Sequence, residues 1–210
     1  MITHVIENQH LILTPDKAMY WEEKRMLILA DLHLGKAAHF RKSGVPISEW
    51  VHAKDFNRMD SLIQQFNPSD ILFLGDLFHS DHNGGWLIFQ QYLQRQTSIQ
   101  FHLVLGNHDI LPTGEYKLHN LLIYNTLKVS PFTFTHIPED TPYYNISGHL
   151  HPAIKMKGKG RQTVHLPCFY FGARQAILPA FGNFTGIAKI KVSKDAHIYA
   201  IADDEVLQVK

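Results

Sequence analysis

The sequence predicts a single α/β domain, and three observations support this prediction. Apolar runs of four to seven residues stop abruptly at glycine or polar residues, as buried strands do. Helical patterns lie between the first three of these runs, and the order strand–helix–strand–helix–strand is typical of a parallel sheet. The 210 residues are 45% hydrophobic and 19% charged, which is enough apolar chain for one sizeable core.

The first half of the chain supplies the parallel part of the expected sheet. Apolar residues recur at helical spacing over 48–66, with Ser48 as the expected N-cap and the pair Asn67-Pro68 as the stop. The expected elements of this half are a hairpin over 10–26, strands over 26–30, 71–74 and 99–105, and helices over 48–66 and 86–93.

The second half is predicted to consist mostly of strands, separated by Gly172, Pro179 and Gly182. These strands would extend or double the sheet with antiparallel pairs. Residues 1–210 would then form one domain, completed by the C-terminal strands over 160–205. The expected strands are 132–135, 143–147, 163–171, 175–178, 186–193 and 197–202.

Composition excludes several classes of protein. Twenty basic and nineteen acidic side chains give a formal net charge of +1, so any attraction for nucleic acid must come from local patches. The single cysteine, Cys168, excludes an internal disulfide and a thiolate metal cage. The N-terminus lacks a signal-peptide pattern, and no apolar run approaches the ~20 residues of a membrane span. We therefore expect a cytoplasmic protein with no membrane partner.

Polar side chains follow five of the predicted strands, at the point where each strand ends. The carboxyl ends of strands in an α/β sheet converge on one edge, where ligands bind. Carboxylate, amide and imidazole groups without sulfur suit manganese, iron, zinc or nickel, and they argue against calcium. One of these candidate ligands, His136, follows a short apolar strand, and His119 or His165 could serve as the ligand in its place. The residues are Asp31, His33, Asp76, Asn107, His108, Asp109, His136, His149 and His151.

The stretch ISGHLHP, residues 146–152, carries two of these histidines. Extended backbone between Gly148 and Pro152 would point His149 and His151 to the same side. A single octahedral ion cannot use all of the collected groups, whereas two ions bridged by a carboxylate can. Two divalent cations held by two aspartates retain positive charge, which favours an anionic phosphate ester and its hydrolysis.

His108 has a separate expected role as general acid. It lies between Asn107, a plausible ligand, and Asp109, which could fix its tautomer and raise its pKa. A protonated imidazole above the leaving group could then protonate the departing oxygen. We therefore predict that His108 and Asp109 take part in catalysis.

The motifs DxH, GDxxH, GNHD, a single His after a strand, and GHxH occur in this order over residues 26–152. This order resembles the calcineurin-like metallophosphoesterase superfamily. The resemblance implies a two-layered β-sandwich flanked by helices and two divalent metal ions, with manganese expected and iron, zinc or nickel as alternatives. It also implies one ion on Asp31, His33 and His151, and the other on Asn107, His136 and His149. Asp76 would bridge the two ions.

Longer stretches, among them DLHLGKAAHFRKSGVPIS and LPCFYFGARQAILPAFGNFTG, resemble the ligase-associated DNA damage response endonuclease branch of this superfamily. That branch implies a bacterial, cytoplasmic, metal-dependent phosphoesterase linked to DNA repair. A functional association with a DNA ligase and a helicase follows from the same resemblance. The sequence departs from the commoner GDxxD pattern at His79, which leaves the support of Asp76 open.

Basic residues near the motifs are candidates for substrate contact. Lys155–Arg161 could form a phosphate track beside the site or a solvated hairpin. Two other functions stay open: hydrolysis of a small nucleotide-like substrate or phosphomonoester, and a non-catalytic scaffold that has kept the fold. The scaffold is disfavoured because every expected ligand is present. The expected substrate-binding residues are Lys36, His39, Arg41 and Arg174.

Overall fold

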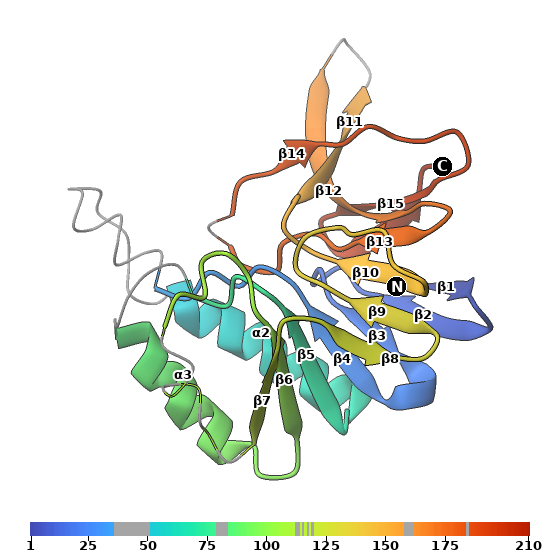
Figure 1. Cartoon of the computed structure of the whole chain (residues 1–210). Helices are drawn as coiled ribbons and strands as arrows, with labels where there is room; N and C mark the ends of the chain where they lie inside the picture. Colours follow the sequence, from blue (N-terminus) through green and yellow to red (C-terminus); the bar gives the residue numbers. More distant parts are fainter. Residues whose placement is uncertain are drawn as a thin grey trace.

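Two β-sheets pack face to face, and helices cover the outer face of one of them (Figure 1). The computed structural model describes residues 1–35, 51–78, 84–111, 114, 116, 118, 120–157, 162–183 and 185–210. This architecture is the two-layered sandwich with flanking helices that the sequence predicts, formed as one domain.

The first sheet contains seven strands in chain order. Its first four strands pair antiparallel and its last four pair parallel. The strands are β1 (Ile2–Ile6), β2 (Gln9–Leu13), β3 (Met19–Trp21), β4 (Met26–Leu29), β5 (Asp70–Leu74), β6 (Gln100–Val104) and β7 (Leu121–Tyr124).

The helices α2 (Val51–Phe66) and α3 (Gly84–Arg95) pack on the outer face of this sheet, and a short 3-10 turn, η1 (Glu22–Lys24), precedes β4. Strand β4 shows why its sequence is apolar throughout. Leu27 and Leu29 face the helices, whereas Met26 and Ile28 face the second sheet. A strand buried on both faces has a continuous apolar sequence, and this apolar run is what predicted the strand.

The second sheet is ordered β14-β11-β12-β13-β10-β9-β8, with β15 beside β12 and β16 beside β15. Its inner face joins the first sheet in a shared core. The strands are β8 (Leu127–Val129), β9 (Phe132–Phe134), β10 (Tyr144–Ser147), β11 (Pro152–Lys157), β12 (Thr163–Phe171), β13 (Gln175–Ile177), β14 (Ala188–Lys189), β15 (His197–Ala202) and β16 (Glu205–Gln208).

The predicted elements are largely confirmed, with the expected differences at their ends. Strands β12 and β15 have the predicted bounds, and α2 and α3 occupy the predicted helices, although Ser48 lies outside the described residues. The strand predicted over 186–193 is wrong in length. Only two of its residues pair, with β11, and most of the others are exposed, so little burial or pairing holds them extended.

Four short strands were not predicted from the sequence, because they too have little buried surface. Strands β1, β7, β8 and β16 contain three to five residues and expose part of their length, so their apolar pattern is weak. None of the helices in the described part of the chain has the length and apolar content needed to cross a bilayer.

Candidate metal centre

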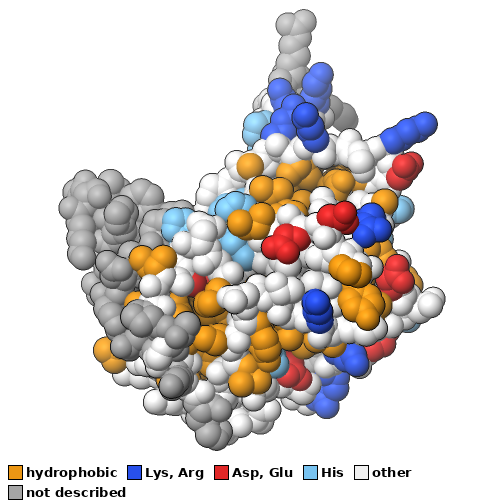
Figure 2. Space-filling model, viewed as in Figure 1, with side chains coloured by type: hydrophobic (Ala, Val, Ile, Leu, Met, Phe, Trp, Pro, Cys, Tyr) orange, Lys and Arg blue, Asp and Glu red, His pale blue; other side chains and the backbone are white. Residues whose placement is uncertain are grey.

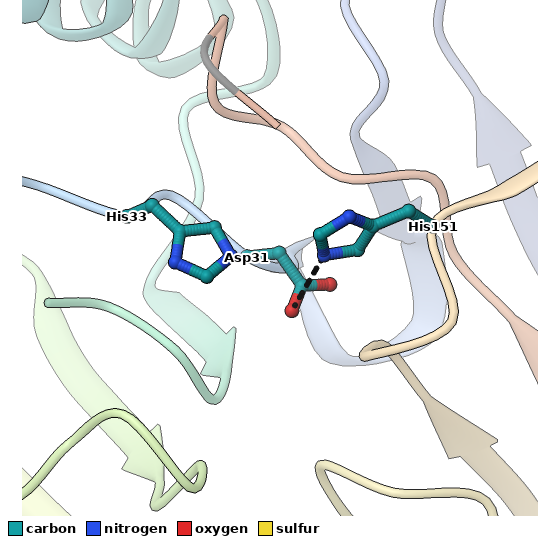
Figure 3. A group of neighbouring side chains, drawn as sticks. All are labelled: Asp31, His33 and His151. Carbon is teal, nitrogen blue, oxygen red and sulfur yellow. Dashed lines mark ion pairs between the residues drawn. The ribbon is translucent and has the colours of Figure 1, made fainter. Parts of the chain in front are cut away.

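Six side chains gather at the ends of strands from both sheets, in two groups of three. The first group is Asp31, His33 and His151, and in each group the ligand atoms lie within 4.8 Å of one another. Figure 3 shows the two imidazoles on either side of the Asp31 carboxylate. His151 Nε2 lies 3.4 Å from Asp31 Oδ1. This group therefore joins the end of β4 in the first sheet to the loop after β10 in the second.

The second group is Asp76, His136 and His149, again one carboxylate and two imidazoles. His136 Nδ1 lies 2.9 Å from the carbonyl oxygen of Leu74, and because a carbonyl only accepts, Nδ1 donates. The neutral ring then presents a lone pair at Nε2. That atom lies 3.0 Å from His149 Nδ1, 3.1 Å from Asn107 Oδ1 and 3.3 Å from Asp76 Oδ1.

Acceptor atoms that converge at such distances call for a cation between them. Where no metal is bound, a proton on His136 can fill this role, and the pKa of His136 is raised as a result. Burial alone would lower this pKa, but the hydrogen bond to Asp76 and the carbonyl of Leu74 raise it above the usual value. The second group thus has the donor chemistry of a nitrogen- and oxygen-ligated divalent ion.

Asp76 lies between the two groups. Its Oδ1 is 3.3 Å from His136 Nε2 in the second group, and its Oδ2 is 3.9 Å from His33 Nε2 in the first. Burial would raise the pKa of this carboxyl, but the partners led by His136 lower it to about 2. An ionised carboxylate with one oxygen toward each group has the geometry of a bridging ligand.

The first group also fits a metal ion. Asp31 Oδ1 is buried and accepts no hydrogen bond in the described part of the chain, a costly state for a carboxylate oxygen. His151 Nδ1 donates to the carbonyl oxygen of Gly186 at 3.0 Å, which leaves its Nε2 lone pair facing Asp31. A cation held by these atoms would satisfy both, and the carbonyl would orient the ring in the manner common for metal-binding histidines.

The backbone at these residues is unusual. Asp31, His33, Asp76, His149 and His151 all have positive φ, between 46° and 66°. Non-glycine residues rarely adopt this left-handed conformation, and its occurrence at five neighbouring positions marks strain held by the surrounding fold. The extended geometry predicted for ISGHLHP is therefore wrong after β10 ends. The two histidines nevertheless reach different groups, as the resemblance implied.

Two glycines of the motifs are required by close approach. A Cβ at Gly106 would lie 2.3 Å from Asp76 Oδ1, and a Cβ at Gly148 would lie 2.7 Å from Asp31 Oδ2. Their neighbours use the same carboxylates. His108 N donates to Asp76 Oδ1 at 2.9 Å, and His149 N donates to Asp31 Oδ2 at 3.0 Å. The glycines thus let the loops of the motifs close over the two aspartates.

His108 and Asp109 differ in their surroundings. The His108 side chain is 42% exposed, and its Nε2 lies 4.0 Å from Asp76 Oδ2. Asp109 is buried, and its two oxygens accept hydrogen bonds from the backbone N–H groups of Phe78 and Gly106, at 3.0 and 2.9 Å. Burial raises the pKa of Asp109 to about 7 in spite of these bonds. These two contacts of Asp109 tie the loops together, and its predicted contact with the His108 ring stays a prediction.

The predicted substrate-binding residues have a mixed outcome. Lys36, His39 and Arg41 lie outside the described residues, as does His79. Arg174 directly precedes β13, which runs parallel to β10, whereas the metal groups lie beyond the far end of β10. Its guanidinium pairs with Asp140 at 3.0 Å and donates to the carbonyl of Thr141. Arg174 therefore lies at the opposite end of β10 from the metal groups, and its contact with substrate stays a prediction.

A segment that sequence reasoning missed supports the first group. Phe181 N donates to the carbonyl of Ala30 at 2.8 Å, and Gly182 N donates to that of Asp31 at 3.1 Å. Asn183 continues the segment and donates to the buried carboxylate of Asp55 on α2 at 2.7 Å. The stretch LPAFGN had been noted only for its resemblance, since nothing in its residue types points to a supporting role.

The comparisons with known proteins agree with this geometry. The model of the calcineurin-like phosphoesterase family matches residues 24–188, which include all the residues of both groups. The crystal structure of Pseudomonas putida nuclease MPE is similar, with a TM-score of 0.81 and 26% identity over 99% of this chain and 99% of that chain. YfcE, a phosphoesterase from E. coli, is more distant, with a TM-score of 0.45 and 14% identity over 88% of this chain and 97% of that chain. No curated protein matches the sequence.

Proposed function

The chain belongs to the calcineurin-like phosphoesterase family, and we propose that it is a phosphodiesterase that works with two divalent metal ions and cleaves DNA. One observation carries the proposal: two three-residue groups of nitrogen and oxygen ligands lie side by side, and the ionised carboxylate of Asp76 in the second group has one oxygen toward each. Two-metal sites of this kind are suited to in-line displacement at phosphorus.

Each residue of the centre has a defined part in this proposal. Asp31, His33 and His151 hold one ion, Asn107, His136 and His149 hold the other, and Asp76 is shared. When bound, such ions supply a nucleophile from water at neutral pH and stabilise charge on the phosphate oxygens. Manganese is the expected metal, with iron, zinc or nickel as alternatives, because nitrogen and oxygen ligands accept all four.

The protein itself supplies the proton for the leaving group. The imidazole of His108 is half exposed beside Asp76, and its backbone N–H is fixed to that carboxylate. The ring can therefore meet a substrate oxygen from the solvent side while its own backbone stays fixed. A histidine in this position can protonate the departing alkoxide, which is general acid catalysis. Asp109 acts as a positioning residue through its bonds to the two loops.

The choice of a diester in DNA is supported by the comparison with the Pseudomonas putida protein, which is named a nuclease. A role in DNA repair in the cytoplasm, alongside a ligase and a helicase, is proposed on the resemblance of the longer sequence stretches. A small nucleotide-like substrate or a phosphomonoester is the competing hypothesis, and substrate preference separates the two.

The deciding experiment compares three substrates with the purified protein and manganese: bis-p-nitrophenyl phosphate, p-nitrophenyl phosphate and a single-stranded DNA oligonucleotide. We expect faster hydrolysis of the diester than of the monoester, cleavage of the oligonucleotide, and loss of all activity with a chelator that manganese restores. A preference for the monoester would sink the nuclease proposal. Elemental analysis of the purified protein should find two metal ions per chain. The variant Asp204→Asn removes an exposed carboxylate outside the centre, so it should keep both ions and full activity.

A further inference from the structure

Charge is distributed very unevenly along this chain. Residues 141–194 contain eight of the twenty Lys and Arg residues and none of the nineteen Asp and Glu residues. The rest of the chain therefore holds twelve cations against nineteen acids. The formal net charge of +1 is the sum of a strongly basic segment and an acidic remainder, so the near-neutral total conceals a local patch.

Much of this basic segment folds into β11, β12 and β14, which we call the basic lobe. Strand β11 pairs antiparallel with β12 and parallel with β14. Figure 1 shows β11, β12 and β14 rising from the sandwich, and Figure 2 shows Lys and Arg side chains gathered on them. Pale-blue histidines lie in the hollow below. The lobe thus overhangs the region where strand ends carry the metal ligands.

One face of the lobe carries its cations. Side chains two residues apart on a strand share a face, so Lys155 and Lys157 lie on the face of Ala153. Lys189 pairs with Ala153 across β14, and His165 pairs with Lys155 across β12. Lys155, Lys157, Lys189 and His165 are all exposed. The four basic side chains therefore form a continuous surface.

This face begins at the metal centre. Strand β11 starts directly after His151, and His151 is bound to the segment leading into β14 by two contacts. Ala188 N donates to the carbonyl of His151 at 2.9 Å, and His151 Nδ1 donates to that of Gly186 at 3.0 Å. Lys155, four residues along the strand, lies about 13 Å beyond His151, which is roughly four nucleotide steps of a B-form strand.

The lobe lysines lack a neutralising carboxylate among the residues that the structure describes. In the described part of the chain, Lys155, Lys157 and Lys189 form no ion pair. Arg58 and Arg174, in contrast, pair with Asp55 and Asp140. Lysines on an exposed strand can also serve only to prevent edge-to-edge aggregation. That role predicts an effect on solubility and none on substrate affinity.

We propose that this basic face binds the phosphate backbone of a polynucleotide on one side of the phosphate that is cleaved. The inference rests on the proposed phosphodiesterase function and adds the surface that selects a polymer over a small diester. A small substrate would occupy only the metal centre, whereas the backbone of Lys155 lies about 13 Å along the strand from that of His151. A polynucleotide would reach both, and its binding would be independent of sequence and sensitive to salt, as phosphate contacts are.

The test replaces the three lysines together, as Lys155→Ala, Lys157→Ala and Lys189→Ala. The control removes three exposed cations outside the lobe, Lys24→Ala, Arg95→Ala and Lys128→Ala. We expect the lobe variant to raise the KM for a single-stranded oligonucleotide by about 10-fold or more at low salt, and to flatten the slope of log KM against log salt by about 2. Turnover of bis-p-nitrophenyl phosphate should stay within about twofold of wild type, because that diester does not reach the lobe.

The outcomes separate the two proposals. If the wild type hydrolyses both substrates and the lobe variant behaves as the control does, the lobe has no part in binding. The proposal for the basic face then fails, while the proposed phosphodiesterase function stands. Equal losses on both substrates would also overturn it, since they indicate damage to the centre. If the wild type hydrolyses no diester, the proposed function fails, and fluorescence anisotropy of a labelled oligonucleotide still decides whether the lobe binds nucleic acid.

Discussion

The two ligand groups have the same composition, yet they are held in different ways. In the second group the ligand atoms converge on one point, since His136 Nε2 lies within 3.3 Å of atoms of His149, Asn107 and Asp76. The carbonyl of Leu74 orients the His136 ring. In the first group the support comes from outside, through the carbonyl of Gly186 and the segment beside Asp31. Each group thus has a carbonyl that orients one imidazole, whereas Asp31 of the first group is also held by the backbone of a distant segment, at Gly182.

This difference suggests that the two ions bind with unequal dependence on the surrounding structure. Changes to distant supports should weaken only the first ion. Changes to the shared carboxylate should affect both, and changes outside the ligands should leave both in place.

Asp76→Asn should abolish activity and remove both ions. Asparagine keeps the oxygen that accepts from His108 N, but its amide NH₂ cannot serve as the second bridging oxygen. The loss in metal affinity should exceed the roughly 10–100-fold that is usual for residues behind the ligands. Elemental analysis and activity should fall together, and retention of two ions would refute the bridging role.

His108→Ala should lower kcat by about 10²–10⁴, the usual scale of general acid catalysis, while both ions remain bound. The backbone N–H of residue 108 still donates to Asp76 in this variant, so the centre keeps its geometry. A diester with a p-nitrophenolate leaving group, which needs little protonation, should lose less than DNA does. Equal losses on both substrates would show that His108 is not the acid.

Gly106→Ala and Gly148→Ala should act on different groups. The first places a Cβ 2.3 Å from Asp76 Oδ1, and the second places one 2.7 Å from Asp31 Oδ2. Because Asp76 is shared, Gly106→Ala should weaken both ions by about 10–100-fold, whereas Gly148→Ala should weaken chiefly the first. Gly114→Ala, where a Cβ meets nothing within 4 Å, is the control. Calorimetric titration with manganese separates the two patterns.

The residues of this centre were predictable because each stands where a buried strand ends. Asp31 and Asp76 follow β4 and β5, whose apolar runs mark both the strand and its end. Since strand ends converge, these side chains were expected at one edge of the sheet, whereas their division into two groups came from the family resemblance. The bounds of β12 and the helical spacing of α2 were recoverable for the same reason, since burial imposes a pattern on residue type.

What escaped prediction depends on backbone groups and on distant contacts. The carbonyls of Leu74 and Gly186 orient two imidazoles, and a carbonyl is present at every residue, so the sequence carries no signal for them. The positive φ of His149 follows from closure of its loop over Asp31, which is a tertiary constraint. The position of Arg174 at the end of β13 away from the metal groups was also not predictable, because spacing to the motifs does not show at which end of a strand a residue lies.

Asp55→Asn gives the smallest expected effect and tests the comparison most directly. The carboxylate of Asp55 holds Asn183 at 2.7 Å and Arg58 at 3.0 Å, and the Arg58 guanidinium lies 4.1 Å from the centre of the Phe181 ring. Through Phe181 and Gly182 this network reaches the backbone on both sides of the Ala30–Asp31 bond. Loss of its charge should loosen that backbone without touching a ligand.

We expect Asp55→Asn to weaken the first ion by about 10-fold, the lower end for supporting residues, and to leave the second unchanged. Asp60→Asn is the matched control, because Asp60 lies on the same helix and binds Tyr92 of α3 instead. Manganese titration should show the wild-type pattern for the control and a weakened first site for Asp55→Asn. If both ions weaken equally, the two groups are one cooperative unit. Their different supports would then have no energetic consequence.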